Sequence, residues 1–334
     1  MNQFRTTTAF TLTLNTVFTL LVLSGLLASC KKDYPTKKGN PKNTDLPLAG
    51  GQSILVINGN VLVSGYYSVK GRLSTKYWIN GESAGQSRFT ELVGNQLGYR
   101  QAVDEKYRTG YTYKDREGKI QTYRFDQGFG AGEGRMFYYK DNLMVRLEND
   151  NIGALTTVAF NDDKPTFAGT LGEMSPDITG GISYHPKTAF IWDGRSPLIK
   201  LALPVQSTLF WGVSTMYSNS PNEFYVGGLC GIPMYWKNTD PVVLDERFGE
   251  VWQITKSGSD IYAVGLVNKI NSNSTGHTAA YWKNKVLHEL QDNAQASGIF
   301  IDGDDVYVTG SVGYVPIDYR PCYWKNGVRV DLPM

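Results

Sequence analysis

Cysteine and histidine are scarce in this chain of 334 residues, with three of each. The histidines, His185, His277 and His288, are scattered and show neither a His-x-x-x-His nor a Glu-x-x-His spacing, so the sequence predicts no metal site. Apart from one cysteine near the N-terminus, only Cys230 and Cys322 remain. They fall in repeat units, described below, that are not neighbours. We therefore expect two buried thiols and no disulfide.

Signatures of cofactors and of catalysis are also lacking. The glycine run that begins at Gly128 has no following Lys-Ser/Thr, which a phosphate loop needs. The acids of Asp302 to Asp305 suggest a calcium loop, but Gly313 stands where the twelfth-position glutamate would bind. Hydrolysis of glycosides needs two carboxylates at a defined separation, and no pair can be chosen. We predict no cofactor and no metal, and favour a binding protein over an enzyme.

Only one long apolar run is present, from Phe10 to Leu27, after the single positive charge of Arg5. It ends in Leu-Ala-Ser-Cys30, which resembles the lipobox of bacterial lipoproteins, where the cysteine is acylated and becomes the mature N-terminus. An uncleaved transmembrane helix is the alternative, but the short positive region and Ser24-Gly25 argue against it. We predict a signal peptide over residues 1–29 and lipidation of Cys30.

Residues 31–50 contain almost nothing apolar. Five lysines, two aspartates and three prolines make this segment, with Cys30, an extended spacer between the lipid anchor and a folded domain at 51–334. The lysines either contact anionic headgroups or simply keep the segment soluble. Lys31 instead of Asp after the cysteine resembles the sorting signal for the outer membrane, and it leaves the periplasmic and the exterior side both open.

The folded part carries no strong charge of either sign. The chain has a formal net charge of +2, and residues 51–334 alone have −2 by count. A near-neutral domain lacks the electrostatic footprint of a nucleic-acid-binding protein. We therefore exclude nucleic acid as a partner and expect a monomer.

Glycine and aromatic residues, in contrast, are abundant and recur in a fixed order. One motif is a turn residue, a short apolar strand and then glycine, as in Asp305 to Gly310. The other is an aromatic residue, tryptophan and a polar turn, as in Tyr323-Trp324-Lys-Asn-Gly. Five copies of the second motif have tryptophan and a sixth has Tyr139 in its place, and these positions are 78, 139, 192, 236, 282 and 324.

The spacing of these copies indicates the fold. The last four tryptophans of this motif, at 192, 236, 282 and 324, follow one another at 44, 46 and 42 residues. A period in the low forties, built of four strands with hairpin turns such as Asn326-Gly327, is typical of propeller blades. We predict an all-β, six-bladed β-propeller of four-stranded blades, with a β-sandwich pair as the main alternative. The tryptophans then fill the wedges between blades, and a ring of sugar-stacking platforms is the alternative role.

The repeats also resemble a known family. Ala189-Phe-Ile-Trp-Asp-Gly194, and Tyr-Trp-Lys-Asn-Gly followed by Val-Asp-Leu332, are similar to the HAF-type extracellular repeats over roughly residues 52–334. That family has an aromatic-Leu-Trp where this chain has Tyr-Trp-Lys-Asn. The resemblance implies a propeller and brings no catalytic residue.

The copies differ most between the second and third strands. The distance from the strand-ending glycine to the aromatic residue is 8 in the fourth copy and roughly 29 in the second, if Gly110 ends its second strand. The second copy then carries an extra hairpin over residues 111–125. Because such loops lie on one face of a propeller, we predict that this face binds the ligand.

Variable loops supply the candidate ligand-binding residues, four of them tyrosines whose faces suit sugars. They are Tyr111, Tyr113, Asp115, Arg116, Tyr123, Arg135, Tyr184, His185 and His277. Three functions stay open: a scaffold for envelope proteins, a glycan-binding lipoprotein, and a glycan hydrolase or lyase. A membrane-anchored binding module for protein or glycan is favoured.

Overall fold

A computed structural model describes residues 48–69, 72–94, 98–103, 109–125, 136–147, 152–176, 182–204, 209–220, 222–269, 276–313 and 319–334. All of these residues belong to the compact unit Thr44–Met334. Cys30, Arg135 and most of the predicted spacer lie outside the described residues. The spacer's last three residues are part of the first strand, which begins at Leu48 and not after Gly50.

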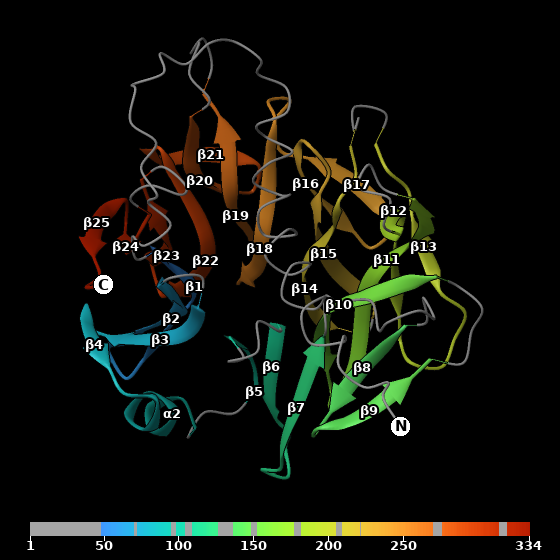
Figure 1. Cartoon of the computed structure of the whole chain (residues 1–334), viewed down its shortest axis with the longest axis horizontal. Coiled ribbons are helices and arrows are strands. Elements are labelled where there is room, and N and C mark those ends of the chain that lie inside the picture. Colours follow the sequence, from blue (N-terminus) through green and yellow to red (C-terminus); the bar gives the residue numbers. More distant parts are fainter. Residues whose placement is uncertain are drawn as a thin grey trace, which may run out of the picture. The chain divides into compact units, whose positions relative to one another are not determined.

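Six antiparallel sheets follow one another along the described chain, each built from consecutive strands (Figure 1). Blade 1 contains β1 (Leu48–Ile57), β2 (Asn60–Val69), β3 (Arg72–Ile79) and β4 (Glu82–Ala84). Blade 2 contains β5 (Gly98–Val103), β6 (Thr109–Lys114), β7 (Ile120–Phe125), β8 (Phe137–Lys140) and β9 (Leu143–Arg146). Blade 3 contains β10 (Gly153–Asn161), β11 (Lys164–Pro176), β12 (Ile182–Trp192) and β13 (Ile199–Leu201).

The remaining blades have four strands each. Blade 4 contains β14 (Gly212–Ser220), β15 (Glu223–Leu229), β16 (Pro233–Lys237) and β17 (Asp240–Val243). Blade 5 contains β18 (Gly249–Ser257), β19 (Asp260–Asn268), β20 (His277–Lys283) and β21 (Val286–Asp292). Blade 6 contains β22 (Ala294–Asp302), β23 (Asp305–Val312), β24 (Arg320–Lys325) and β25 (Val328–Asp331).

The blades form a closed ring. Each blade contacts the next one in sequence, and β22, β23 and β24 of blade 6 contact β1 of blade 1 (Figure 1). A ring of six such sheets, five with four strands and one with five, with first-to-last closure is a six-bladed β-propeller, so the predicted fold is confirmed. The sandwich alternative would need two stacked sheets, which this strand order excludes.

Two-residue turns set the register inside the blades. At Asn80-Gly81 both residues have positive φ, 53° and 87°, which is the type I′ geometry that matches strand twist. The backbone N–H of Val61 donates to Asn80 Oδ1 at 2.8 Å, and the N–H of Asn80 donates back to the carbonyl of Val61. The same pair of bonds ties the third-to-fourth-strand turn to the second strand in blades 4, 5 and 6, through Asn238, Asn284 and Asn326.

The recurring glycine of the second strand has a steric cause. A Cβ on Gly65 would lie 2.0 Å from the carbonyl oxygen of Gly50, and one on Gly265 would lie 1.8 Å from that of Glu250. In both blades the first strand shifts register at this point. The backbones therefore approach too closely for any side chain.

The tryptophans fill the spaces between blades, as predicted. Trp78, Trp236, Trp282 and Trp324 are at most 1% exposed, and each packs with residues of its own blade and of the preceding one. Trp192 is the exception. It is half-buried, and its indole N–H donates to the carbonyl of Ser196 in its own turn at 2.9 Å.

Blade 2 departs from the prediction. Its turn residue Asp141 bonds to the backbone of Thr122 in the way that Asn80 bonds to Val61, so β7 is the second strand and β6 the first. The proposed extra hairpin at 111–125 is therefore wrong, because these residues are the two inner strands of the blade itself. Tyr139 pairs with Arg124 at the place where tryptophan stands elsewhere, as predicted.

The additional length of blade 2 lies before β6. Residues 85–108 include helix α2 (Gln86–Gly94) and β5, the additional strand that makes this sheet five-stranded. Phe89 of α2 packs on Tyr77 of blade 1, with ring centroids 4.7 Å apart. In the described part of the chain, no helix is long and apolar enough to cross a membrane.

Both remaining cysteines are buried thiols, as predicted. Cys230 is in blade 4 and Cys322 in blade 6. Burial raises the pKa of the Cys230 thiol to about 12, which keeps it protonated and unreactive at neutral pH.

Candidate functional site

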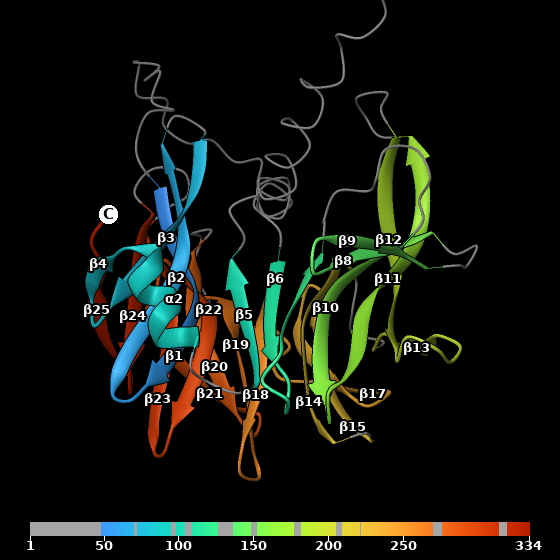
Figure 2. The same ribbon diagram turned by 90° about the horizontal axis from the view of Figure 1, so that it is seen from below.

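The propeller has two unlike faces. Because strands alternate in direction, the turns after the first and third strands of every blade lie on one face. The connections between second and third strands lie on the other. Figure 2 shows the turns after β1, β18 and β22 along the lower edge, while β2, β3, β11 and β12 extend toward the upper edge. We name these the short-turn face and the long-loop face.

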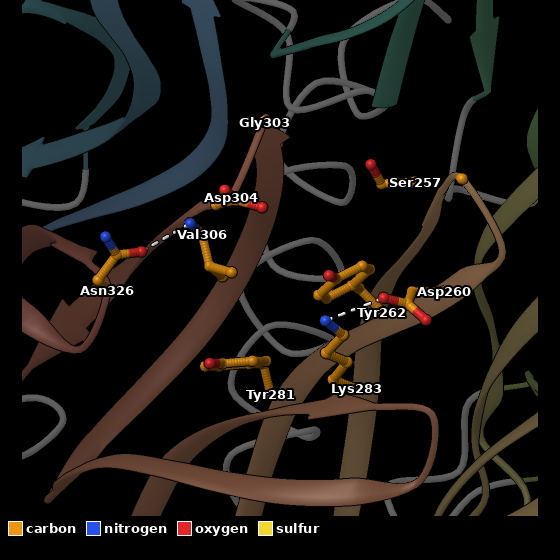
Figure 3. Close-up of a pocket in the computed structure, with 10 residues that line it drawn as sticks. Ser257, Asp260, Tyr262, Tyr281, Lys283, Gly303, Asp304, Val306 and Asn326 are labelled. Carbon is orange, nitrogen blue, oxygen red and sulfur yellow. Dashed lines mark hydrogen bonds and ion pairs between the residues drawn. The ribbon is translucent and has the colours of Figure 1, made fainter.

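A groove opens between blades 5 and 6 on the short-turn face (Figure 3). Its volume is about 450 Å³. Seven of its lining residues come from the turns and strand starts of β18–β19 and β22–β23, two from β20 and one from the turn after β24. They are Ser257, Gly258, Asp260, Tyr262, Tyr281, Lys283, Gly303, Asp304, Val306 and Asn326.

An ion pair lies over an aromatic ring on the blade 5 side of this groove. Lys283 Nζ is 2.9 Å from Asp260 Oδ2 and 5.5 Å from the centroid of the Tyr262 ring. Hydrogen bonds from Lys283 and from Asn284 lower the pKa of the Asp260 carboxyl. The pair is partly exposed, so both groups stay charged at neutral pH and are open to a ligand.

The third strand supplies a second ring. Tyr281 stacks on His288 of β21 with centroids 4.6 Å apart and planes at 4°, which fixes the orientation of the tyrosine. In Figure 3 Tyr281 lies between Lys283 and the blade 6 side of the groove. A ring held in this way offers an apolar surface at little cost in side-chain entropy.

Blade 6 closes the other side with polar groups. Asp304 is the exposed second residue of the β22–β23 turn, and its neighbour Gly303 has a φ of 59°. Asn326 accepts the N–H of Val306 at 2.8 Å and donates to Asp305 at 2.7 Å, so this amide is already used by the fold. The groove thus combines a fixed ring, an ion pair and one further carboxylate.

The three predicted tyrosines of blade 2 lie on its strands and not in a loop. Tyr111 and Tyr123 are each 2% exposed and pack in the core shared by blades 2 and 3. Tyr113 is 8% exposed and stacks on Phe160, while its hydroxyl donates to Asp163. These rings are strand residues of the blade, so in this structure they offer no face to a sugar.

Asp115 and Arg116 lie in the β6–β7 turn, on the short-turn face. Asp115 is 8% exposed and accepts the backbone N–H of Lys119 at 2.7 Å, closing its own turn. Arg116 is exposed and pairs with Asp162 in the corresponding turn of blade 3. Both side chains join elements of the fold, and a ligand-binding role for them stays a prediction.

The other described candidates lie toward the long-loop face. Tyr184, on β12, donates its hydroxyl to Thr170 on β11 at 3.0 Å, and burial raises its pKa to about 12. His185 is exposed beside it. His277, at the start of β20, pairs with Asn268 at 3.2 Å, and burial lowers its pKa. The structure brings Tyr184 and His185 together on blade 3, apart from His277 on blade 5.

None of the groove residues was among the predicted site residues. The available signal was the set Asp260-Ile-Tyr262 with Tyr281-Trp-Lys283, which appeared only as part of a structural motif. Because the same residues recur in blade 6 as Asp305, Tyr307 and Lys325, they resemble scaffold in the sequence. The neighbours that make the blade 5 residues part of a groove come from blade 6, one repeat of 42 residues further along the chain.

Residues 81–85 read Gly-Glu-Ser-Ala-Gly, which has the Gly-x-Ser-x-Gly spacing of a nucleophile elbow. A nucleophile elbow places this serine on a sharp turn between strand and helix. Ser83 instead lies within β4, paired with Trp78, and its φ is not positive. His185, His277 and His288 belong to blades 3 and 5, so this serine has no histidine of its own blade as a base.

Metal and catalytic chemistry have little support in the described residues. Across those residues, no three side chains from His, Cys, Asp and Glu gather as metal ligands would. In the groove, the lowered pKa of Asp260 makes it a poor general acid. The arrangement suits binding by stacking, ion pairing and hydrogen bonds.

Comparison with known proteins finds similar solved structures but no related sequence. No family model and no curated protein matches the sequence. The β-propeller domain of the Trilobed protease from Pyrococcus furiosus is similar, with 11% identity, a TM-score of 0.38, and coverage of 86% of this chain and 96% of that one. A fungal six-bladed propeller, the fucose-recognising Aleuria aurantia lectin, has 11% identity, a TM-score of 0.42, and coverage of 84% and 92%.

The ring of blades defines the class of the molecule: it is an all-β, six-bladed propeller.

Proposed function

We propose that this propeller is a binding module of the bacterial cell envelope, anchored by a lipid on Cys30, and that it holds a glycan in the groove between blades 5 and 6. The observation that carries the proposal is that the fixed Tyr281 ring, an ion pair and a further carboxylate line one groove of about 450 Å³. Sugars present C–H faces that stack on aromatic rings and hydroxyl pairs that bond to charged groups.

The lipid anchor is supported by sequence alone. The order of an apolar run, small residues and Cys30 fits a lipobox, and Lys31 fits sorting to the outer membrane. Stable attachment to a membrane needs two signals, and the acyl chains on a lipoprotein cysteine exceed that number. The HAF-type resemblance is consistent with an extracytoplasmic propeller, and both membrane sides fit.

A glycan hydrolase or lyase is the alternative function. Asp260 and Asp304 do line one groove, which is the observation that favours it. However, a general acid needs a raised pKa, and the Asp260 carboxyl has a lowered one. Binding without turnover is therefore the better conclusion.

The test is a glycan array probed with the full chain in detergent micelles. Tyr281→Ala should lose at least tenfold in affinity for the glycans that bind, because the ring is the fixed stacking surface. Tyr235→Ala is the matched control, since Tyr235 holds the same strand position in blade 4. Its affinity should stay within about twofold of wild type.

Two results would contradict this function. One is an array without binding, together with reproducible capture of an envelope protein, which would favour a protein scaffold. The other is equal loss in both tyrosine variants at unchanged melting temperature, which would place the ligand elsewhere.

A further inference from the structure

Between blades 4 and 5, a side chain of the protein itself occupies the position equivalent to the groove between blades 5 and 6, and we name this position the filled groove. Lys256, near the end of β18 in blade 5, extends toward blade 4. Its Nζ lies 2.8 Å from Glu223 Oε2 and 5.8 Å from the centroid of the Tyr225 ring. The ammonium group is only partly exposed, and the ion pair lowers the pKa of the Glu223 carboxyl. The ammonium group of Lys256 therefore occupies the filled groove between blades 4 and 5.

Strand register identifies the equivalent positions in the groove between blades 5 and 6. Glu223 and Tyr225 begin the second strand of blade 4 as Asp260 and Tyr262 begin that of blade 5. Lys256 pairs with Ile261 in blade 5, and Ile301 pairs with Val306 in blade 6. Isoleucine therefore stands where the neighbouring groove receives a lysine.

A second difference adds a negative charge. The turn residue that follows is Ser259 in blade 5 and Asp304 in blade 6, and Asp304 lines the open groove. The filled groove holds Glu223, Lys237 and Lys256, with a net charge of +1. The open groove holds Asp260, Lys283 and Asp304, with a net charge of −1.

The acid and the ring in the open groove can still accept a cation. A carboxylate has about four acceptor sites, and Asp260 uses its two oxygens on Lys283 and Asn284 once each. An aromatic ring attracts an ammonium group on its face, and a partly enclosed net negative charge favours a positive ligand. A neutral hydroxyl would not balance this charge.

We propose that the groove between blades 5 and 6 binds a protonated primary amine of its ligand, in the way that the neighbouring groove holds the ammonium group of Lys256. Building on the proposed glycan function, the ligand is then an amino sugar with a free amine. The amine lies near Asp304 and Asp260, and the sugar ring lies on Tyr281. The groove between blades 6 and 1 lacks this character, because Val56 and Gly59 hold the positions of Ile301 and Asp304.

Two matched sugars test the ligand class. The full chain in detergent micelles is titrated at pH 6 with short β-1,4-linked glucosamine oligomers and with the same oligomers fully N-acetylated. Acetylation removes the positive charge of each amine and leaves the sugar backbone of the oligomer unchanged. We expect the free amines to bind at least tenfold more tightly, and this preference to shrink at high salt.

Two variants place the amine in the groove. Asp304→Asn should reduce the preference for the free amine to less than threefold, whereas Asp302→Asn, in the same turn but outside the lining, should keep it. Ile301→Lys should block both oligomers, because it supplies the ammonium group that Lys256 supplies next door. If Ile301→Lys does not fold, the Asp304 and Asp302 pair still decides the question.

The outcomes separate the two proposals. Equal binding of both oligomers, lost in Tyr281→Ala, would overturn the amine assignment and leave glycan binding in place. No binding of either oligomer, or an unchanged preference in Asp304→Asn, would overturn the amine assignment as well. An array empty of every glycan would remove the glycan function itself.

Discussion

The indole N–H of Trp78 donates to the carbonyl oxygen of Pro333 at 2.8 Å, across 255 positions of sequence. It joins the third strand of blade 1 to the chain just after the last strand of blade 6. The Ser297 hydroxyl adds a bond to the carbonyl of Gly51, and the N–H of Ala49 donates to Tyr319. The ring is thus closed by bonds and packing between blades, and among the described strands no sheet combines the two ends of the chain.

Removing the Trp78 bond should weaken closure. Trp78→Phe leaves the Pro333 carbonyl without this donor and also reduces buried volume. Trp282→Phe is the matched control, because its indole nitrogen has no hydrogen-bond partner in the described part of the chain. We expect Trp78→Phe to cost on the order of 1–3 kcal/mol more than Trp282→Phe in urea unfolding. Equal costs would mean that the bond contributes nothing to closure.

The turn asparagines should tolerate aspartate but not alanine. Asn80→Ala removes the acceptor for the Val61 N–H and places alanine at a φ of 53°, so we expect a loss of about 1–2 kcal/mol. Asn80→Asp keeps the acceptor, as Asp141 does in blade 2, and should cost less than about 0.5 kcal/mol. Chemical denaturation measures both. If Asn80→Asp costs more stability than Asn80→Ala, the hydrogen bond from the Val61 N–H to the Asn80 side chain is not what stabilises the turn.

Glu250 should make stability fall as the pH rises. This side chain of β18 is 1% exposed, and burial raises its pKa from 4.5 to about 8. Between these values the unfolded chain has released the proton and the folded chain still holds it. Stability therefore decreases from about pH 5 to pH 8, by on the order of 2–4 kcal/mol.

A neutral replacement tests this sign. Glu250→Gln should flatten the pH dependence of the unfolding free energy and exceed wild type in stability at pH 8. Glu82→Gln, on the exposed edge strand β4, is the control and should keep the wild-type profile. A wild-type chain that gains stability toward pH 8 would disprove the account of Glu250.

The lipid anchor is tested by Cys30→Ala. Wild type should incorporate labelled palmitate and sediment with membranes, whereas the variant should do neither, because Cys30 is the predicted acylation site. Cys230→Ala is the labelling control, since that thiol is buried in blade 4. Palmitate on the Cys30→Ala protein would show that the lipobox interpretation is wrong.

Local chemistry explains how far the sequence predicted the fold. Asn-Gly turns and the close approach at Gly65 depend on residues near one another in the chain, and the tryptophans recur at one position of the repeat, so these patterns are visible in the sequence. Blade 2 was misaligned for the same reason. The second copy has Asp126 at the sequence position where the others have glycine, so the alignment on Gly110 is wrong.

The groove could not be predicted in this way. Its two sides come from different blades, and its character depends on which residue of blade 6 faces which residue of blade 5. Ile301 and Asp304 are ordinary in their own repeat and become distinctive only beside Asp260 and Tyr262. The site was predicted in the long loops because differences in loop length are visible in the sequence, whereas contacts between repeats are not.

The most direct test of the account is hydrogen–deuterium exchange of the full chain with and without a saturating glucosamine oligomer. We expect ligand protection in peptides that cover residues 257–262, 281–283 and 303–306, on the short-turn face between blades 5 and 6. Protection confined to residues 182–187 or 276–277, on the long-loop face, would contradict it.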